Sequence, residues 1–292
     1  MTMQAALLPD GRRLHLQHGP IDLVIEAWGA PAEIAAAYRQ AVSAFQPVLS
    51  ELVSELPLLR RALPATGPMP LTDGEIARQM IAACLPYRTG FITPMAAVAG
   101  AVADHILQAL LAGRDLTKAY VNNGGDIAVW MRAGQVLDCG LVTDLGAPQL
   151  AGVMHLSSEM RIGGIATSGA PGKGQGGRSF SLGIAEAVTV LARDAATADA
   201  AATIIANAVD LPGHPMIERV PAVSIDPDSD LGQQLVTISV PRLLPEDVAC
   251  ALEFGRRVAD DLCRSGMILA AVLAFQDEIS LCGSLLQGRL AA

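Results

Sequence analysis

The pattern of apolar and polar residues predicts a β-hairpin near the start of the chain, followed by helices. Apolar residues alternate with polar ones on both sides of a His-Gly-Pro turn at 18–20, which is typical of two antiparallel strands. Pro31 fits the first turn of a helix, and apolar positions recur at helical spacing over 33–45. Because Pro47 interrupts this helix, residues 49–63 are expected to continue it in shorter pieces.

Proline and glycine mark a break after this region. The segment PATGPMP, at 64–70, is the clearest linker in the chain. Thr72 and Glu75 have the spacing of a capping box, which predicts that a helix opens there and runs to Ala83.

The longest apolar stretch runs from 94 to 113 and is long enough to be considered as a membrane span. Asp104, His105 and Gln108 would then lie in hydrocarbon, which is costly. We therefore expect a buried helix of a soluble protein, with Thr93 and Pro94 at its start. Its alanine and glycine face predicts a short distance to a neighbouring element.

The second half of the chain interleaves apolar strand-like runs with helical segments. The predicted strands are 119–122, 127–132, 136–142, 186–192, 234–240 and 267–275, and the predicted helices are 195–209 and 245–265. This order indicates an α/β (α+β) protein with mixed β-sheets flanked by helices. We expect a single domain over 1–292, with 1–63 as a candidate N-terminal subregion and 64–70 as its linker.

Composition narrows the classes of function. Twenty basic against 29 acidic residues give a net charge of −9, and aromatic residues are only 3% of the chain. Neither value suits a protein that binds nucleic acid. The five cysteines form no CxxC pair, and the N-terminal apolar run is too short for a secretory signal. We therefore expect reduced, buried thiols, a cytoplasmic location and no membrane partner.

A glycine-rich loop at 169–177 is the most conspicuous candidate for ligand binding. Its glycines would let backbone amides approach a phosphate, and Lys173 would add positive charge. The loop fits neither a Walker A motif nor a Rossmann fingerprint, since a strand rather than a helix follows it. A surface loop without a ligand remains an equal alternative.

Asp199 and Thr203 lie four residues apart on a helix otherwise made of small and apolar residues. This spacing places both side chains on one face, where their oxygens suit Mg²⁺ or Ca²⁺. The alternative is a solvated Asp199 and a Thr203 hydroxyl bonded to its own helix. The segment NNGGD at 122–126 is by itself a hairpin turn, although a turn alone makes no special use of Asp126.

Together these weak signals resemble the ApbE superfamily, flavin transferases that bind FAD and magnesium. The order of the motifs is similar: Gly100 four residues before Asp104, NNGGDI at 122–127, ATSG at 166–169, VTVLA at 188–192 and ADAAAT at 198–203. Over nearly the whole chain the sequence more closely resembles a sister branch of that superfamily without an agreed reaction. Segments that carry this closer likeness are HGPIDLVIEAWG at 18–29, TPMAAVAGAVAD at 93–104 and SLGIAEAVTVLA at 181–192.

The resemblance implies a site and a reaction. Asp199 and Thr203 would bind the magnesium of a bound flavin dinucleotide. The residues that would line the ligand cleft or face its phosphates and flavin are Asn123, Gly124, Gly125, Asp126, Thr167, Ser168 and Gly169. The implied chemistry is cleavage of the FAD pyrophosphate with loss of AMP, followed by transfer of FMN to a protein threonine or by release of FMN.

The sequence departs from the transferases in two places. Ala99 stands where they carry a lysine, and the segment 177–190 lacks their histidine and their Asp-Pro-x-Thr-Gly turn. No catalytic residue is therefore assigned. Two alternatives to an enzyme remain: a protein that binds FAD, FMN or another anionic metabolite without breaking it, and a scaffold that has changed substrate. The small-residue helix and apolar strands are also compatible with a homodimer.

Overall fold

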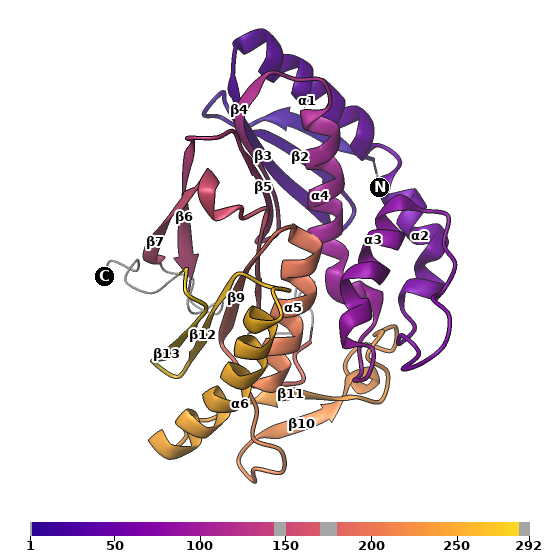
Figure 1. Cartoon of the computed structure of the whole chain (residues 1–292). Coiled ribbons are helices and arrows are strands. Elements are labelled where there is room, and N and C mark those ends of the chain that lie inside the picture. Colours follow the sequence, from indigo (N-terminus) through magenta and orange to yellow (C-terminus); the bar gives the residue numbers. More distant parts are fainter. Residues whose placement is uncertain (1, 143–149, 170–179, 286–292) are drawn as a thin grey trace. The chain divides into compact units, whose positions relative to one another are not determined.

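The computed structural model describes residues 2–142, 150–169 and 180–285 of the chain. They form two compact units, which are coloured along the sequence in Figure 1. The first comprises Met1–Leu137, Leu156–Ala166 and Ala192–Ala200, and the second comprises Asp138–His155, Thr167–Leu191 and Ala201–Ala292. The expected single domain over 1–292, with 1–63 as a subregion, stays a prediction.

The first unit is built on antiparallel strands in the order β1-β2-β3-β4-β5-β8. Their bounds are β1 Gln4–Leu7, β2 Leu14–His18, β3 Ile21–Gly29, β4 Leu116–Asn123, β5 Asp126–Met131 and β8 Gly164–Ser168. The predicted hairpin is confirmed, because His18 pairs with Ile21 across the turn. Leu14, Leu16, Leu23 and Ile25 are its buried, alternating positions.

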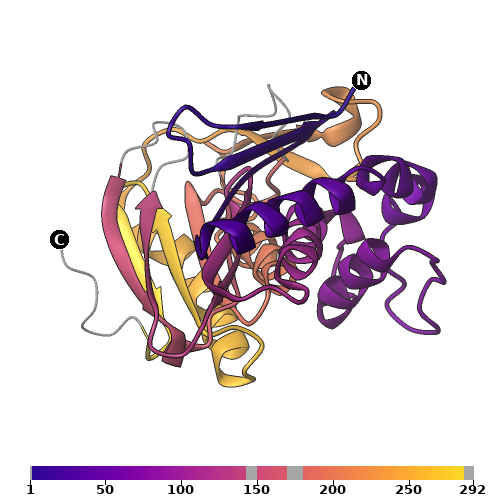
Figure 2. The same cartoon turned by 90° about the horizontal axis from the view of Figure 1, so that it is seen from above.

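Helices cover this sheet and begin largely where prolines predict. Their bounds are α1 Pro31–Phe45, α2 Val48–Leu59, α3 Glu75–Cys84 and α4 Val98–Leu111, with a 3₁₀ turn at Pro94–Ala97 before α4. The helix α4 packs on β4 and β5 and against α1 and α3. Figure 2 shows the hairpin of β1 and β2 lying beside α1. Because α4 lies between sheet and helices, its small residues are buried.

The predicted capping box at Thr72 and Glu75 is wrong. The cap of α3 is Gly74, and no side chain completes it. The amide of Gly74 donates to Glu55 Oε1 at 2.6 Å, so a carboxylate from α2, and not one from α3 itself, satisfies the amide of the capping residue. Within the described chain, Thr72 Oγ1 is buried without a hydrogen-bond partner.

The segment Pro94–Leu111 is the one described helix that is long and apolar enough to cross a membrane. Buried positions make up 56% of it, as expected for a core helix. The predicted cytoplasmic location and absence of a membrane partner stay predictions.

The described residues of the second unit contain three groups of strands. The strands β9 Ala187–Ala192, β12 Ala270–Phe275 and β13 Glu278–Cys282 lie in the order β9-β12-β13. Two further pairs are β6 Val136–Val142 with β7 Leu150–Ser157, and β10 Glu218–Pro221 with β11 Leu235–Ser239. The helix α6 Pro245–Arg264 packs on β12 and β13. The predicted class, mixed sheets flanked by helices, is confirmed.

One helix, α5 Ala195–Ala208, begins in the first unit and continues into the second. The predicted cap of this helix is confirmed, since Asp194 Oδ1 accepts the amide of Thr197 at 2.7 Å. All five cysteines are unpaired, as predicted. The expectation that the thiols are buried holds for Cys84 and Cys282 and is wrong for Cys250, which is exposed.

Candidate functional site

The NNGGD segment forms the turn between β4 and β5. Gly124 and Gly125 have φ values of +64° and +117°, which side chains rarely adopt, and a Cβ at either position would meet no atom within 4 Å. The amide of Gly125 donates to Asn122 Oδ1 at 2.8 Å and closes the turn. Both glycines are exposed, and no atom of the described residues fills the space where their side chains would lie.

Asn123 fixes this turn to the start of α4. Its side chain is 8% exposed, and its Nδ2 donates to the carbonyl oxygen of Ala99 at 3.0 Å. A buried amide that makes such a bond leaves a costly unpaired partner when it is removed. The asparagine therefore holds the glycine turn against the helix.

Replacing Asn123 with alanine is expected to lower the free energy of unfolding by about 1–2 kcal/mol, because the carbonyl of Ala99 then loses its buried donor. Chemical denaturation measures this change. Asn122→Ala is the matched comparison, since its bond to Gly125 is exposed. A cost for Asn123→Ala no larger than that for Asn122→Ala would contradict the anchoring role.

Asp199 joins α5 to the start of α4, next to the residue that Asn123 contacts. Its Oδ2 accepts the amide of Gly100 at 3.0 Å. Burial, and then the negative charge of Asp126, hold the pKa of Asp199 well above its usual range, although the amides of Gly100 and Ala99 oppose the rise. Asp126 and Asp199 are therefore close enough to repel each other. Asn123 and Asp199 thus bond to adjacent residues, Ala99 and Gly100, at the start of α4.

Asp104 supports this arrangement from α4. Its Oδ1 accepts the amide of Ala195 at 3.0 Å, and its Oδ2 accepts the amide of Ala196 at 2.9 Å and Gln79 Nε2 at 2.9 Å. The carboxylate thereby satisfies two amides at the beginning of α5. Burial raises the pKa of Asp104 to about 7 despite these donors.

Gly100 lies one turn before Asp104 and allows a close approach of α4 to the start of α5. A Cβ on Gly100 would lie 2.2 Å from the carbonyl oxygen of Ala195. Gly100 and Asp104 thus form a single contact with the start of α5, which explains why glycine precedes the aspartate by four residues. The sequence analysis notes this spacing but misses the role of Asp104. A single carboxylate in an otherwise apolar helix is the feature that could have indicated that role.

The remaining predicted site residues belong to the second unit, which includes the last two residues of β8. Thr167 Oγ1 lies 2.9 Å from Thr189 Oγ1, so its hydroxyl bonds to the neighbouring strand. Gly169 has φ +135°, and a Cβ there would lie 2.8 Å from the carbonyl oxygen of Glu186. Ser168 ends β8, and Thr203 stands half-buried one turn beyond Asp199 on α5. Lys173 and the rest of the glycine-rich loop lie outside the described residues.

The donor set around Asp199 fits a divalent cation of the magnesium type. No three His, Cys, Asp or Glu side chains of the described ranges gather closely enough to form a metal cage. Mg²⁺ is usually held by one or two carboxylates and completed by waters and phosphates. A cation beside Asp199 would also relieve the repulsion by Asp126 that the raised pKa reports.

Comparison with known proteins identifies the family. A family model described as AbpE bacteria matches residues 5–281. The chain belongs to this family. This match confirms the membership of the ApbE superfamily that the motifs predict. The chain is also similar to UPF0280 proteins of archaea, which confirms the predicted sister branch.

A UPF0280 protein of Archaeoglobus fulgidus is 32% identical over 183 residues, which cover 62% of this chain and 71% of the relative. One from Methanopyrus kandleri is 41% identical over 133 residues, 46% and 48% of the two chains, so that match spans about half of the relative. The structure of the ApbE protein of Thermotoga maritima aligns over 100% of both chains with a TM-score of 0.54 at 14% identity. This likeness shows a shared fold.

Proposed function

We propose that this protein binds FAD or a related dinucleotide together with a divalent cation at Asp199. The observation that carries the proposal is that Asn123 of the glycine turn and Asp199 of α5 bond to the adjacent residues Ala99 and Gly100, with Gly124 and Gly125 exposed beside them. The negative charge of Asp126, which acts on Asp199, favours a cation there, and the exposed main chain of the two glycines favours the close approach of a phosphate. Membership of the family supports the choice of a flavin.

Each residue of the site has a proposed task. Asp199 binds the cation through the carboxylate oxygen that Gly100 does not occupy, and the Thr203 hydroxyl joins it from the next turn of α5. Asn123 fixes the turn on which Gly124 and Gly125 receive the ligand, and Asp126 strengthens the attraction for the cation. Thr167, Ser168 and Gly169 are retained as candidate contacts to the phosphates or flavin.

The proposed reaction is cleavage of the dinucleotide pyrophosphate. A hydroxyl, from water or from a threonine of a protein acceptor, attacks the phosphorus on the FMN side, and the bond to the AMP oxygen breaks. A bound magnesium ion would neutralise the negative charge that develops on the phosphate oxygens. Asp199 and Asn123 contribute by holding the binding groups in fixed positions, which lowers the cost of orientation.

Binding without cleavage is the second candidate function, and one observation favours it. Ala99 stands where the resembling transferases carry a lysine, and its carbonyl is already engaged by Asn123. A methyl group at this position can neither stabilise a charged phosphate nor transfer a proton. The two candidates share the same cation site and differ only in the release of AMP.

The test combines FAD titration with product analysis. We expect FAD to bind in the presence of Mg²⁺, binding to be lost in EDTA, and Asp199→Asn to bind at least tenfold more weakly, which is about 1.4 kcal/mol. Asparagine keeps an acceptor for the Gly100 amide, so the variant should fold. Asp261→Asn, an exposed acid on α6, is the matched control.

Chromatography of the bound and released nucleotides then separates the two candidates. AMP released in step with FMN, or with FMN attached to an added acceptor protein, supports the enzyme. FAD recovered intact from a tight, Mg²⁺-dependent complex supports the binding protein. If the wild-type protein does not bind FAD at saturating Mg²⁺, the proposal is wrong.

A further inference from the structure

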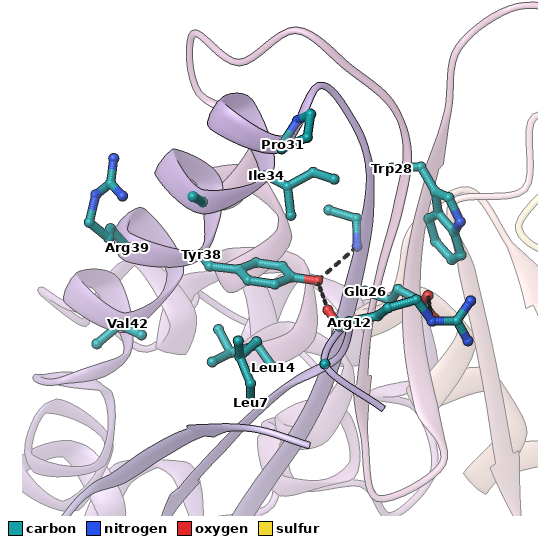
Figure 3. Close-up of a pocket in the computed structure, with 13 residues that line it drawn as sticks. Leu7, Arg12, Leu14, Glu26, Trp28, Pro31, Ile34, Tyr38, Arg39 and Val42 are labelled. Atoms are coloured by element: carbon teal, nitrogen blue, oxygen red, sulfur yellow. Dashed lines mark hydrogen bonds and ion pairs between the residues drawn. The ribbon is translucent and has the colours of Figure 1, made fainter. Parts of the chain in front are cut away.

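Two edge strands carry exposed apolar side chains. On β1, Leu7 is 57% exposed, but it pairs with Leu14 of its own hairpin and lies beside it at a cavity that α1 also lines (Figure 3). On β13, Ile279 and Leu281 are 53% and 42% exposed. Among the described residues, β13 is the last strand of its sheet. It therefore presents two large apolar side chains at an edge that no described strand covers.

The main-chain groups of the same two residues point away from β12. The amide of Glu186 donates to the carbonyl oxygen of Ala274 at 3.0 Å, so the main chain of Ala274 faces β9 and not β13. Ile279 lies opposite Ala274 in the register of β12 with β13. Because the facing pairs of an antiparallel ladder alternate, the N–H and C=O groups of Ser280 face β12, and those of Ile279 and Leu281 face outward. No hydrogen bond within the described part of the chain engages these outward groups.

Both apolar side chains lie on the face of β13 that points away from α6. A Cβ on Gly255 of α6 would lie 2.9 Å from Leu273 Cδ2, so the side chain of Leu273 points to this helix. Ser280 lies opposite Leu273 and therefore shares its face. Since successive side chains of a strand alternate between the two faces, Ile279 and Leu281 point to the other one. The edge thus combines apolar side chains on one face with main-chain donors and acceptors at the same two positions.

The hairpin that presents this edge is fixed at its turn. Gln276 and Asp277 have φ values of +46° and +70°, as in the two-residue turns that suit the twist of a hairpin. The side chain of Gln276 donates from Nε2 to the carbonyl oxygen of Pro241 at 2.6 Å and accepts the amide of Leu243 at 2.9 Å. Arg242 Nη1 donates to Asp277 Oδ2 at 2.6 Å. Because these bonds hold the hairpin before any partner binds, the entropic cost of association is lower.

We propose that β13 pairs with β13 of a second copy of this chain, antiparallel and about a two-fold axis at Ser280. In this register, Ile279 of each copy lies opposite Leu281 of the other copy. Each of these two pairs exchanges two main-chain hydrogen bonds, so four bonds cross the interface. The four apolar side chains meet on the face away from α6, where aliphatic cross-strand pairs stabilise a sheet.

The symmetry of the edge favours a second copy over an unrelated strand. The outward groups lie on either side of Ser280, so a strand of the same sequence satisfies all of them in an isologous contact. Parallel pairing would place Glu278 beside its own counterpart, whereas the antiparallel register separates the two carboxylates by four residues, or about 13 Å. The pairing uses the free edge of both copies and therefore stops at a dimer. This dimer does not depend on the binding of a dinucleotide.

Sedimentation velocity across the micromolar range of concentration tests the proposal on the full chain. We expect the wild type to dimerise, and Leu281→Pro and Ile279→Lys each to raise the dissociation constant of the dimer at least tenfold. Proline removes one outward N–H and none of the N–H groups that bond to β12, and the lysine replaces an exposed side chain. Ile225→Lys is the matched control, because Ile225 is 42% exposed in the same unit and lies outside β13. A wild type that stays monomeric throughout, or a dimer that neither variant weakens, would overturn the proposal.

A cysteine at the two-fold axis tests the register. The two copies of Ser280 would face each other at a position without main-chain bonds, where Cα atoms lie about 4.5 Å apart and a disulfide can form. With diamide as the thiol oxidant, Ser280→Cys should give a covalent dimer on a non-reducing gel, in a Cys250→Ser background that removes the exposed native thiol. Ser284→Cys is the control, since Ser284 is exposed beyond the end of β13 and four residues from the axis. Equal cross-linking of the two variants, or none of Ser280→Cys, would overturn the pairing.

Discussion

Replacement of Gly100 by alanine is expected to lower the free energy of unfolding by at least about 3 kcal/mol, the upper part of the range for overpacked cores. A Cβ at this position would lie 2.2 Å from the carbonyl oxygen of Ala195, 2.5 Å from its carbonyl carbon and 2.8 Å from the amide nitrogen of Ala196. All three are backbone atoms, so no side chain can rotate away. The two helices must separate instead.

Separation of α4 from α5 would also break the hydrogen bonds that need the two helices close together. The amide of Gly100 would lose Asp199, and Asp104 would lose one or both amides at the beginning of α5. Loss of the folded unit and loss of the candidate cation site are therefore expected together. This coupling is why the effect should exceed that of an ordinary methyl group added to a core.

Denaturant unfolding, followed by far-UV circular dichroism, measures the change. Gly90→Ala is the control, since a Cβ there would meet its nearest atom at 3.7 Å and the backbone needs no positive φ. In an unobstructed helix, glycine to alanine stabilises by about 0.5–1 kcal/mol. A gain of that size for Gly100→Ala would mean that α4 and α5 do not touch at this point.

Local signals in the sequence predicted much of the fold. The helix at Pro31, the interruption at Pro47 and the strand at 136–142 depend on neighbours along the chain, and the structure confirms each of them. The edge strands β1 and β13 were missed, because they are short and mostly exposed and lack a clear alternation. Local patterns cannot show a strand whose pairing partner alone defines it.

The candidate site was only half predictable for the same reason. The glycines of the turn and the cap at Asp194 follow from local chemistry. The contact of Asp199 with Gly100 joins residues 99 positions apart, and that of Asp104 with Ala195 joins residues 91 apart. Such contacts come from the packing of α4 on the start of α5. The small residues and the Gly100–Asp104 spacing indicate a close neighbour of α4, but they do not show which element it is.

A pH-dependent stability centred on Asp104 is the second large effect that we expect. Its pKa is about 7 in the folded protein against an ordinary value of 3.8, so between these values the folded state holds a proton that the unfolded state has released. The free energy of unfolding therefore falls as the pH rises through this window and becomes level above about pH 7. Between pH 5 and pH 8, the contribution of Asp104 to the free energy of unfolding falls by about 3 kcal/mol.

Other acids also titrate, so the change must be compared with that of Asp104→Asn, whose side chain cannot ionise. The carboxamide offers one acceptor oxygen where the carboxylate receives Ala195, Ala196 and Gln79, so the variant should be less stable at every pH. Its stability should nevertheless decline less steeply from pH 5 to pH 8 than that of the wild type. Parallel pH profiles would show that the two amides at the beginning of α5 outweigh burial and keep Asp104 ionised throughout. Asp104 would then act as a charged cap of α5, and the favourable direction of the helix dipole would explain the ionised state.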